Sequence, residues 1–426
     1  MLRSWVCAGL LGTQVLSCKG QGAGPPSPSV SASGAGIAAA AVVSGSAQAK
    51  SAEGCLTTLD YLVPPQKYPG GDLIRAVLVD GDQVYFRNMH ELMRVPLAGG
   101  PISNVGKAPE LSLRGTTELW QAGDELVMQS PGEPIFMKAK KAGGAWSSFI
   151  DLTAAKKGGG RDAATRILQG LGGPAAPRAT DAAFDGQAFY FAEITREKGK
   201  NAADSSKLLR VAFAGGEPQT LFTTPGTISE VTRAGEQLAF HLVLPPTPEA
   251  IKAQEQERKK NKFAAAASGE QWVMAVPVAG GTAKRLMRLS SVFSGGLVGT
   301  STILGADGAR LYLSGYADED LTKPGIYRVE LTNGASERLD QRFVRGTAYV
   351  AGERVVILGS GAVEPGQSKY GTLVLTVPRD GKNVGLAACI ADKSTLHATA
   401  LAGNVALLSL FQPSTDTAVV VKVPLP

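Results

Sequence analysis

The side chains that could do acid–base or metal chemistry are few and are spread along the chain. The three histidines, His90, His241 and His397, form no HxH, HExxH or Cys/His cluster, so the pattern predicts no metal site. No nucleophile elbow, phosphate-binding loop or dinucleotide fingerprint is present. We therefore expect the histidines in the core or on the surface, and we predict no cofactor and no catalytic residue.

Two stretches have weaker patterns. The carboxylates at 318–320 could hold Ca²⁺, but the stretch lacks the Gly and Glu of a calcium loop. Three glycines at 158–160 follow two lysines without a strand-to-helix context. A solvated turn and a flexible loop are the favoured interpretations.

A repeated phrase determines where these residues lie. It begins with a small or acidic residue and Gly ahead of an apolar strand, which predicts a tight hairpin. It continues with a strand that ends in a second Gly turn, such as VPLAGG at 95–100, VPVAGG at 276–281 and VPRDG at 377–381. The first turn occurs seven times, at Asp80-Gly81, Ala122-Gly123, Asp185-Gly186, Ala234-Gly235, Asp307-Gly308, Ala351-Gly352 and Ala402-Gly403.

Strand, turn, strand, loop, strand, turn, strand describes a four-stranded antiparallel meander. Tandem units of about 45 residues each predict an all-β chain folded as a seven-bladed β-propeller. The seventh unit ends at Pro426, before its last strand. The stretch 55–63, CLTTLDYLV, has the composition of a strand, and we expect it to close the ring. A β-sandwich, a two-domain all-β protein, and rings of six or eight blades are the alternatives.

Residues 1–18 resemble a bacterial lipoprotein signal, with Arg3, a short apolar run at 5–11, and Val-Leu-Ser before Cys18. The resemblance implies that Cys18 is acylated and that the protein is exported and lipid-anchored in the cell envelope. The apolar run is shorter than the about 20 residues that span a bilayer. Plain secretion with cleavage near 47–49 is the alternative. Residues 19–52, rich in Gly, Ala, Ser and Pro, predict a flexible tether, followed by the propeller domain at 53–426.

Two cysteines, Cys55 and Cys389, fall in the predicted propeller. A lone pair in an exported chain suggests one disulfide, near the seam that closes the ring. The predicted geometry argues against this disulfide. Cys55 would begin its strand at one rim of the ring, whereas the strand of Cys389 would end at the opposite rim, and a disulfide needs Cα atoms within about 7 Å. The sequence leaves both states open.

Insertions are predicted on one face of the disc. Turns between first and second and between third and fourth strands share a face, which we expect to be uniform and inert. Insertions at 154–178, 193–207 and 244–271 fall on the other face, and the last contains a predicted helix of about 16 residues from Pro248. The insertions carry the basic residues Lys156, Lys157, Arg161, Arg196, Lys198, Lys200, Arg258, Lys259, Lys260 and Lys262. These residues would attract an anionic partner, or they are simply solvated.

The phrase resembles the bacterial propellers of the TolB-like and related-repeat group, over residues 73–426. The resemblance implies binding, scaffolding or sensing, and it transfers no catalytic residue, because the shared motifs are turns and strands. Some relatives carry an appended hydrolase domain; none is expected here, because the seventh unit ends the chain.

The leading interpretation is a binding module for a protein, peptide or glycan of the cell envelope. The net charge of +6, with 44% hydrophobic and 19% charged residues, is ordinary for a globular domain and does not indicate nucleic acid. The alternative is a lyase or glycoside hydrolase that uses paired carboxylates about 5 to 9 Å apart at the ring axis. Glu118, Asp181 and Glu230 are the acids on the predicted inner strands.

Overall fold

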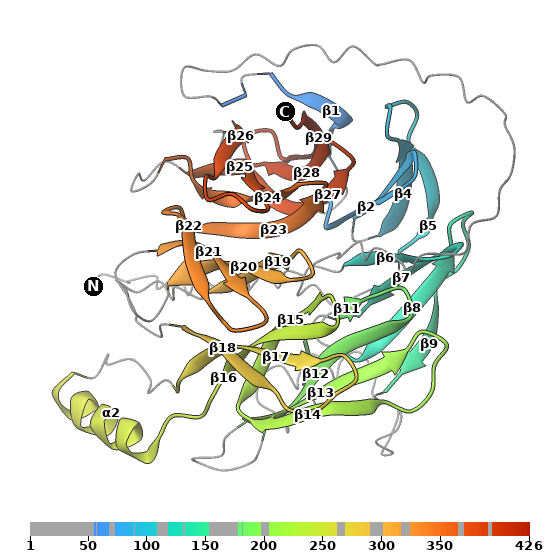
Figure 1. The fold of residues 1–426 in the computed structure, drawn as a ribbon. Coiled ribbons are helices and arrows are strands. Elements are labelled where there is room, and N and C mark those ends of the chain that lie inside the picture. Colours follow the sequence, from blue (N-terminus) through green and yellow to red (C-terminus); the bar gives the residue numbers. More distant parts are fainter. Residues whose placement is uncertain are drawn as a thin grey trace, which may run out of the picture.

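The computed structural model of the chain describes residues 55–56, 58–67, 73–88, 90–108, 118–130, 133–152, 178–180, 182–196, 204–261, 269–289, 301–316, 324–364, 370–390 and 394–426. Within these residues the strands form seven antiparallel sheets that follow one another around a ring (Figure 1). The predicted seven-bladed propeller is therefore confirmed.

Blades one to six take their strands in chain order, and blade seven adds β1 to its last three strands. Blades one to three contain β2 (Ala76–Asp80), β3 (Gln83–Arg87), β4 (Glu91–Pro96), β5 (Ser103–Lys107); β6 (Leu119–Ala122), β7 (Glu125–Gln129), β8 (Ile135–Lys140), β9 (Ser147–Asp151); and β10 (Arg178–Ala179), β11 (Ala183–Phe184), β12 (Ala188–Arg196), β13 (Asp204–Ala212), β14 (Gln219–Pro225). Blades four and five contain β15 (Thr227–Ala234), β16 (Gln237–Val243), β17 (Gln271–Pro277), β18 (Lys284–Leu289); and β19 (Thr302–Ala306), β20 (Arg310–Tyr316), β21 (Pro324–Glu330), β22 (Ser336–Asp340). Blades six and seven contain β23 (Val344–Ala351), β24 (Arg354–Ala362), β25 (Tyr370–Pro378), β26 (Gly385–Ile390); and β27 (Thr395–Ala402), β28 (Val405–Gln412), β29 (Thr417–Pro424) with β1 (Asp60–Gln66).

The first strands of neighbouring blades contact one another, as β2 and β27 or β19 and β23 do, so they surround the ring axis. In blade three this innermost strand is divided in two, because β10 and β11 both pair with β12. We call the end of the ring with the Gly turns the turn face, and the opposite end the loop face.

The repeated phrase forms the hairpins that it predicts. Gly81 between β2 and β3 has a φ of 59° and Gly403 between β27 and β28 has a φ of 57°, a left-handed conformation that costs glycine little. In blade three the loop is one residue longer, and the Asp185 carboxylate folds over it to accept the N–H groups of Gln187 and Ala188 at 2.8 and 2.7 Å. Aspartate at this position is therefore part of the turn.

The ring is closed by β1, which pairs antiparallel with β29. An N-terminal strand thus completes the last blade, as predicted. The predicted bounds of 55–63 are wrong at both ends, because Cys55 and Leu56 lie parallel to β26 of blade six instead. The N–H of Leu56 donates to the Cys389 carbonyl at 2.7 Å, and the Leu56 side chain is buried between blades six and seven.

The core lies between neighbouring blades. Between blades two and three, aromatic rings pack against each other, and the ring centroids of Phe136 and Phe189 are 4.2 Å apart. Burying such a side chain stabilises the fold by about 1.5 to 3 kcal/mol. At the same junction Gln129 donates to the Thr180 carbonyl at 2.9 Å and accepts the N–H of Ala182 at 2.7 Å. Each blade is thus held to its neighbour by apolar packing and by hydrogen bonds.

Candidate functional site

The loop face carries helix α2 (Pro248–Lys260), between β16 and β17 of blade four. The helix predicted from Pro248 is confirmed, with 13 residues. The Thr247 hydroxyl accepts the N–H of Ala250 at 3.2 Å as the N-cap. Glu249 lies in the first turn, and Arg258, Lys259 and Lys260 lie in the last. This distribution complements the helix dipole.

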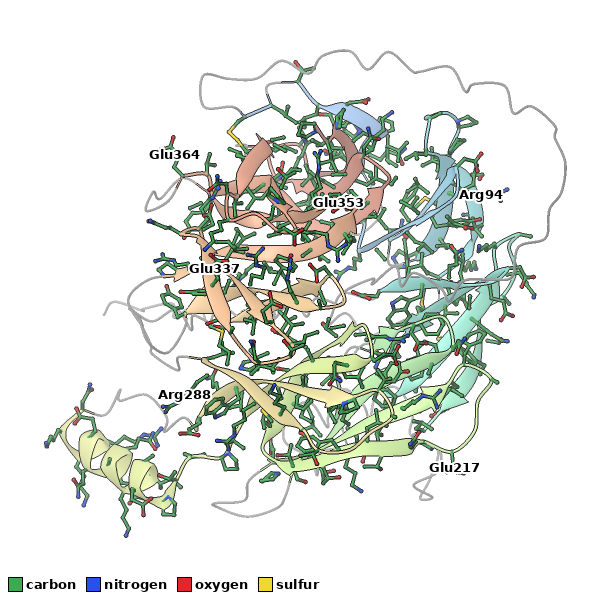
Figure 2. The ribbon with its side chains drawn as sticks, viewed as in Figure 1. Arg94, Glu217, Arg288, Glu337, Glu353 and Glu364 are labelled. Atoms are coloured by element: carbon green, nitrogen blue, oxygen red, sulfur yellow. A yellow bond between two sulfur atoms is a disulfide. The ribbon has the colours of Figure 1, made fainter. Side chains whose placement is uncertain are left out.

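None of the side chains of α2 is buried. The helix projects away from the ring, and its side chains point outward in all directions (Figures 1 and 2). A helix that is polar on every side has no apolar stripe with which to pack against a blade. Arg258, Lys259 and Lys260 are all exposed, so α2 presents three adjacent positive charges to the surroundings.

The two arms of this insertion meet where they leave the blade. The N–H of Leu244 donates to the Glu270 carbonyl at 2.8 Å, which continues the pairing of β16 and β17. A Cβ on Gly269 would overlap the carbonyl oxygen of Leu244, so the close approach of the arms requires glycine there. The helix is therefore attached to a rigid hairpin through a narrow base.

The structure places only part of the predicted basic surface. Arg196 ends β12 on the loop face, and the three basic residues of α2 are described above. The remaining members, Lys156, Lys157, Arg161, Lys198, Lys200 and Lys262, lie outside the described residues. Their gathering with α2 stays a prediction.

The two cysteines of the propeller are joined. A disulfide links Cys55 and Cys389, whose Cα atoms are 4.4 Å apart. The geometric argument against the pair does not apply, because Cys55 is not part of β1 and crosses to blade six. Cys18 lies outside the described residues, and its lipidation stays a prediction.

Glu230 is a predicted acid that lies within an innermost strand, β15 of blade four. It stands in the middle of β15 at a β-bulge, where pairing with β16 shifts between Ser229 and Thr232, and its φ is 54°. Its carboxylate accepts the N–H of Ile303, in β19 of the next blade, at 2.8 Å. Burial raises the pKa of Glu230 to about 7, although the hydrogen bond from Ile303 opposes the shift. Of the other predicted acids, Glu118 directly precedes β6 and Asp181 lies outside the described residues.

A second bulge on the ring axis presents His397. The pairing of β27 with β28 shifts between Leu396 and Ala398, so His397 is the extra residue. Burial, with a smaller contribution from the positive charge of Arg75, lowers the pKa of His397 to about 4. Bulges re-aim side chains and are common beside functional sites. The sequence pattern does not connect Arg75 with His397. Both residues lie near the start of an innermost strand, in the first and the last unit, and these units become neighbours when the ring closes.

His241 is a core histidine, as predicted. It is buried in β16, and burial lowers its pKa to about 4 against the opposing effect of a hydrogen bond with Gln271. His90, just before β4, is exposed. Among the residues that the structure describes, no three His, Cys, Asp or Glu side chains form a group that could hold a metal ion. The same residues include no helix with the length and apolar character needed to cross a membrane.

The turn face is not uniform, contrary to the prediction. Aspartates from the Gly turns of blades one, three and five each form an ion pair with a basic residue of the following blade. These pairs are Asp80–Lys141, Asp185–Arg233 and Asp307–Arg379. Each pair joins two blades where their turns come together.

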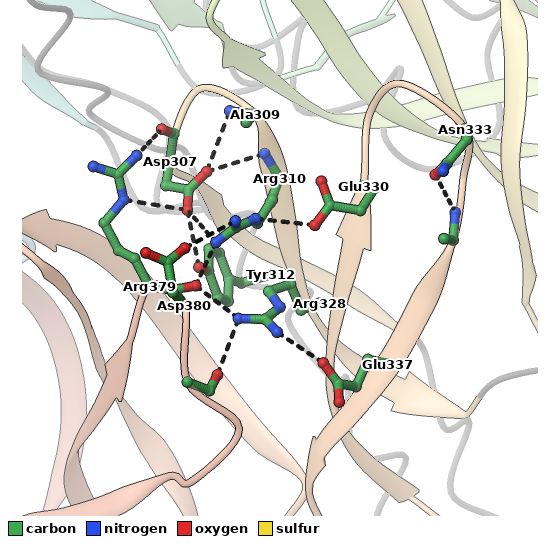
Figure 3. A network of polar contacts seen from close by, with 12 residues as sticks. Asp307, Ala309, Arg310, Tyr312, Arg328, Glu330, Asn333, Glu337, Arg379 and Asp380 are labelled. Atoms are coloured by element: carbon green, nitrogen blue, oxygen red, sulfur yellow. Dashed lines mark hydrogen bonds and ion pairs between the residues drawn. The ribbon is translucent and has the colours of Figure 1, made fainter.

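The pair of blades five and six belongs to a larger network (Figure 3). Arg379 lies 3.5 Å from the carboxylate of Asp307, which also accepts a hydrogen bond from the Tyr312 hydroxyl at 3.0 Å. Arg310 reaches across to Asp380 at 3.1 Å. Since the charges in this network pair with one another, we interpret it as a junction between blades rather than a binding site.

Comparison with known proteins identifies the fold. No protein-family model matches the chain, and no curated protein matches it. Among solved structures, the chain is similar to an oligogalacturonate lyase in complex with manganese, with 11% identity, a TM-score of 0.50, and coverage of 82% of this chain and 87% of that one. It is also similar to the oligogalacturonate lyase of Vibrio parahaemolyticus, with 10% identity, a TM-score of 0.53, and coverage of 86% and 93%. TolB from Acinetobacter baumannii matches with 12% identity, a TM-score of 0.33, and coverage of 82% and 79%. At these identities the similarity concerns the propeller fold alone.

Proposed function

We propose that the protein is an exported, lipid-anchored propeller that acts as a binding or scaffolding module for an anionic protein, peptide or glycan of the cell envelope. The observation that carries this proposal is α2, an exposed helix that ends in three adjacent basic residues and is attached to a rigid blade. Loops held by a rigid scaffold are the usual carriers of binding. The anchor rests on Cys18 and the lipoprotein-like residues before it.

The chemistry of α2 favours an electrostatic mode of binding. The helix offers no buried or apolar side to a partner, so recognition rests on the charges of Arg258, Lys259 and Lys260. Exposed charges act within a Debye length of about 8 to 10 Å, and they chiefly raise the rate of association. Binding through α2 should therefore weaken as the salt concentration rises.

The test compares the full chain with the variant Arg258→Glu/Lys259→Glu/Lys260→Glu. The probes are dextran sulfate, polyglutamate and anionic lipid vesicles, at low and physiological salt. We expect the full chain to bind at least one probe in a salt-dependent way, and the variant to lose that binding. The probe that binds indicates whether the partner resembles an acidic glycan, an acidic protein or a lipid surface.

Two further variants make the test specific. Reversal of Lys140, Lys284 and Lys382 changes the net charge equally, but these exposed residues flank the turns of the other face, so probe binding should persist. Replacement of 247–268 by a short Gly/Ser turn removes the helix while the Leu244–Glu270 hydrogen bond can still close the hairpin. The proposal fails if probe binding is insensitive to the α2 variants and to salt, or if the control reversal abolishes it equally.

A second candidate function is an enzyme that acts at the ring axis, a lyase or a glycoside hydrolase. Glu230 favours it, because a carboxyl group with a pKa of about 7 can donate or accept a proton near neutral pH. The similar solved structures include two oligogalacturonate lyases, which makes oligogalacturonate the first substrate to assay. Formation of the unsaturated product, followed by ultraviolet absorbance, should then be lost in Glu230→Gln. Absence of product from the unaltered chain would count against this substrate.

A further inference from the structure

Arg75 stands where the last blade meets the first. It directly precedes β2, the innermost strand of blade one, beside β27 of blade seven (Figure 1). The Ser409 hydroxyl of blade seven donates to the carbonyl of Ile74 at 2.7 Å. The N–H of Arg75 itself donates to the Arg87 carbonyl at 2.8 Å. The backbone that carries Arg75 is thus held by both blades.

The side chain of Arg75 has no carboxylate partner among the described residues, unlike several arginines at blade junctions. Arg233, Arg328 and Arg342 each have a carboxylate partner. The Nε of Arg75 is buried and has no hydrogen-bond partner. Within the described part of the chain, its guanidinium also forms no ion pair. A guanidinium stays charged and carries five N–H donors, and a buried donor without an acceptor is costly. Such a group is suited to an acceptor that is not part of the fold.

His397 supplies the second polar group at this place. The bulge in β27 re-aims its ring. Ser409, which is bonded to Ile74 beside Arg75, pairs with Ala398 beside His397. Arg75 and His397 therefore meet at this junction, where the charge of Arg75 acts on the imidazole. The ring of Phe411 packs edge-on against His397, with 6.5 Å between ring centroids. A guanidinium, an imidazole and an aromatic ring thus gather at the junction of blades seven and one, near the ring axis.

We propose that Arg75 and His397 form a binding site for the oxyanion group, carboxylate or phosphate, of a small ligand. The planar guanidinium matches two oxygens of such a group and binds them with paired, charge-assisted hydrogen bonds. The imidazole can donate a third hydrogen bond, and Phe411 offers an apolar surface to the ligand's body. This proposal is independent of the proposed function, because it involves neither α2 nor the membrane anchor.

The charges around His397 determine how its pKa should respond when an anion binds. Arg75 is the charged group that acts on His397. Two of the predicted acids lie on or beside innermost strands: Glu118 directly precedes β6, which contacts β2, and Glu230 lies in blade four with its carboxylate bonded to Ile303. A bound anion would offset the charge of Arg75 and stabilise the imidazolium, so it should raise the pKa of His397. By linkage, binding then takes up a proton and becomes tighter as the pH falls from about 6 towards about 4, the pKa of the free imidazole.

The experiment is a nuclear magnetic resonance titration of the histidine side chains in the full chain. Only three histidines are present, and single His→Gln variants assign their resonances. The probes are sodium acetate and inorganic phosphate, each against sodium chloride at the same ionic strength. We expect the pKa of His397 to rise by about 1 or more with at least one probe, while the resonances of His90 and His241 stay unchanged. Acetate and phosphate distinguish a carboxylate from a phosphate ligand.

The Arg75→Gln variant separates binding from general screening. Without a probe, the pKa of His397 should rise, because the neighbouring charge is removed; with a probe, it should not rise further. Arg94→Gln, on β4 and away from the axis (Figure 2), should behave like the unaltered chain. The proposal is overturned if acetate and phosphate shift His397 no more than chloride does in the unaltered chain, or if Arg75→Gln responds equally.

Discussion

The buried carboxyl of Glu230 makes the stability of the ring depend on pH in a way that a single substitution can remove. The side chain accepts one backbone N–H, from Ile303 at 2.8 Å, and burial raises its pKa from 4.5 to about 7. Glutamine has nearly the same shape, stays neutral at every pH, and can accept the same hydrogen bond through its amide oxygen. Glu230→Gln therefore removes the charge and keeps the contact.

The sign and size follow from linkage. Below pH 4.5 the carboxyl is protonated in both the folded and the unfolded chain, so its full contribution to stability is present. As the pH rises through 7, the unfolded chain gives up its proton first, and stability is lost. A difference of about 2.5 between the two pKa values corresponds to about 3 kcal/mol. Glu230→Gln should thus be more stable than the unaltered chain by about 3 kcal/mol at pH 8, and by almost nothing at pH 4.

Urea unfolding of both proteins at several pH values between 4 and 8 measures this difference. The buried His241 and the partly buried His397 also titrate in this range, with lowered pKa values, but they occur in both proteins and cancel in the comparison. Glu217→Gln, an exposed position (Figure 2), serves as a control and should stay within about 0.5 kcal/mol at every pH. A difference between Glu230→Gln and the unaltered chain that does not change with pH would refute the reasoning.

Three other outcomes are expected. Cys18→Ala should move the protein from the membrane to the soluble fraction, because it removes the acylated thiol; unchanged membrane partition would contradict the lipid anchor. Cys55→Ser/Cys389→Ser should lower the melting temperature, since the bridge closes a loop with a sequence separation of 334 residues and such a crosslink stabilises by up to about 5 kcal/mol; a melting temperature equal to that of the oxidised chain would count against the bridge. A chain that begins at residue 68 lacks β1 and leaves β29 as an open edge, so it should aggregate in light scattering; a monomer with unchanged melting temperature would argue against closure by β1.

The local features of the fold could be predicted from the sequence because each has a short-range cause. The glycine of Asp80-Gly81 permits the left-handed turn, and Pro248 with the preceding Thr247 marks the start of α2. The closing strand was found by its composition. The bounds of this strand could not be predicted in the same way, because Cys55 contacts Cys389 of blade six, more than three hundred residues away in the chain.

The polar groups on the axis could not be predicted in the same way. Glu230 and His397 are presented by β-bulges, and a bulge is a shift in pairing between two strands that leaves no reliable mark on either one. In the sequence, Arg75 is an ordinary charged residue ahead of a predicted strand. Its position beside His397 depends on which blade becomes the neighbour of the first, and therefore on the closure of the whole ring.

The seven junctions between blades show why Arg75 is unusual. The turn between the first and second strands is Asp-Gly in blades one, three and five, and each of these aspartates pairs with the following blade. The corresponding turns of blades two, four, six and seven carry alanine in place of aspartate, so the junctions that follow these blades use different links. Their cross-blade hydrogen bonds include Gln129–Thr180, Glu230–Ile303, Tyr349–Thr399 and Ser409–Ile74. The last of these already joins blade seven to blade one, with β1 closing the ring beside it. Arg75 is therefore not needed to hold this junction, which leaves its guanidinium available for the proposed ligand.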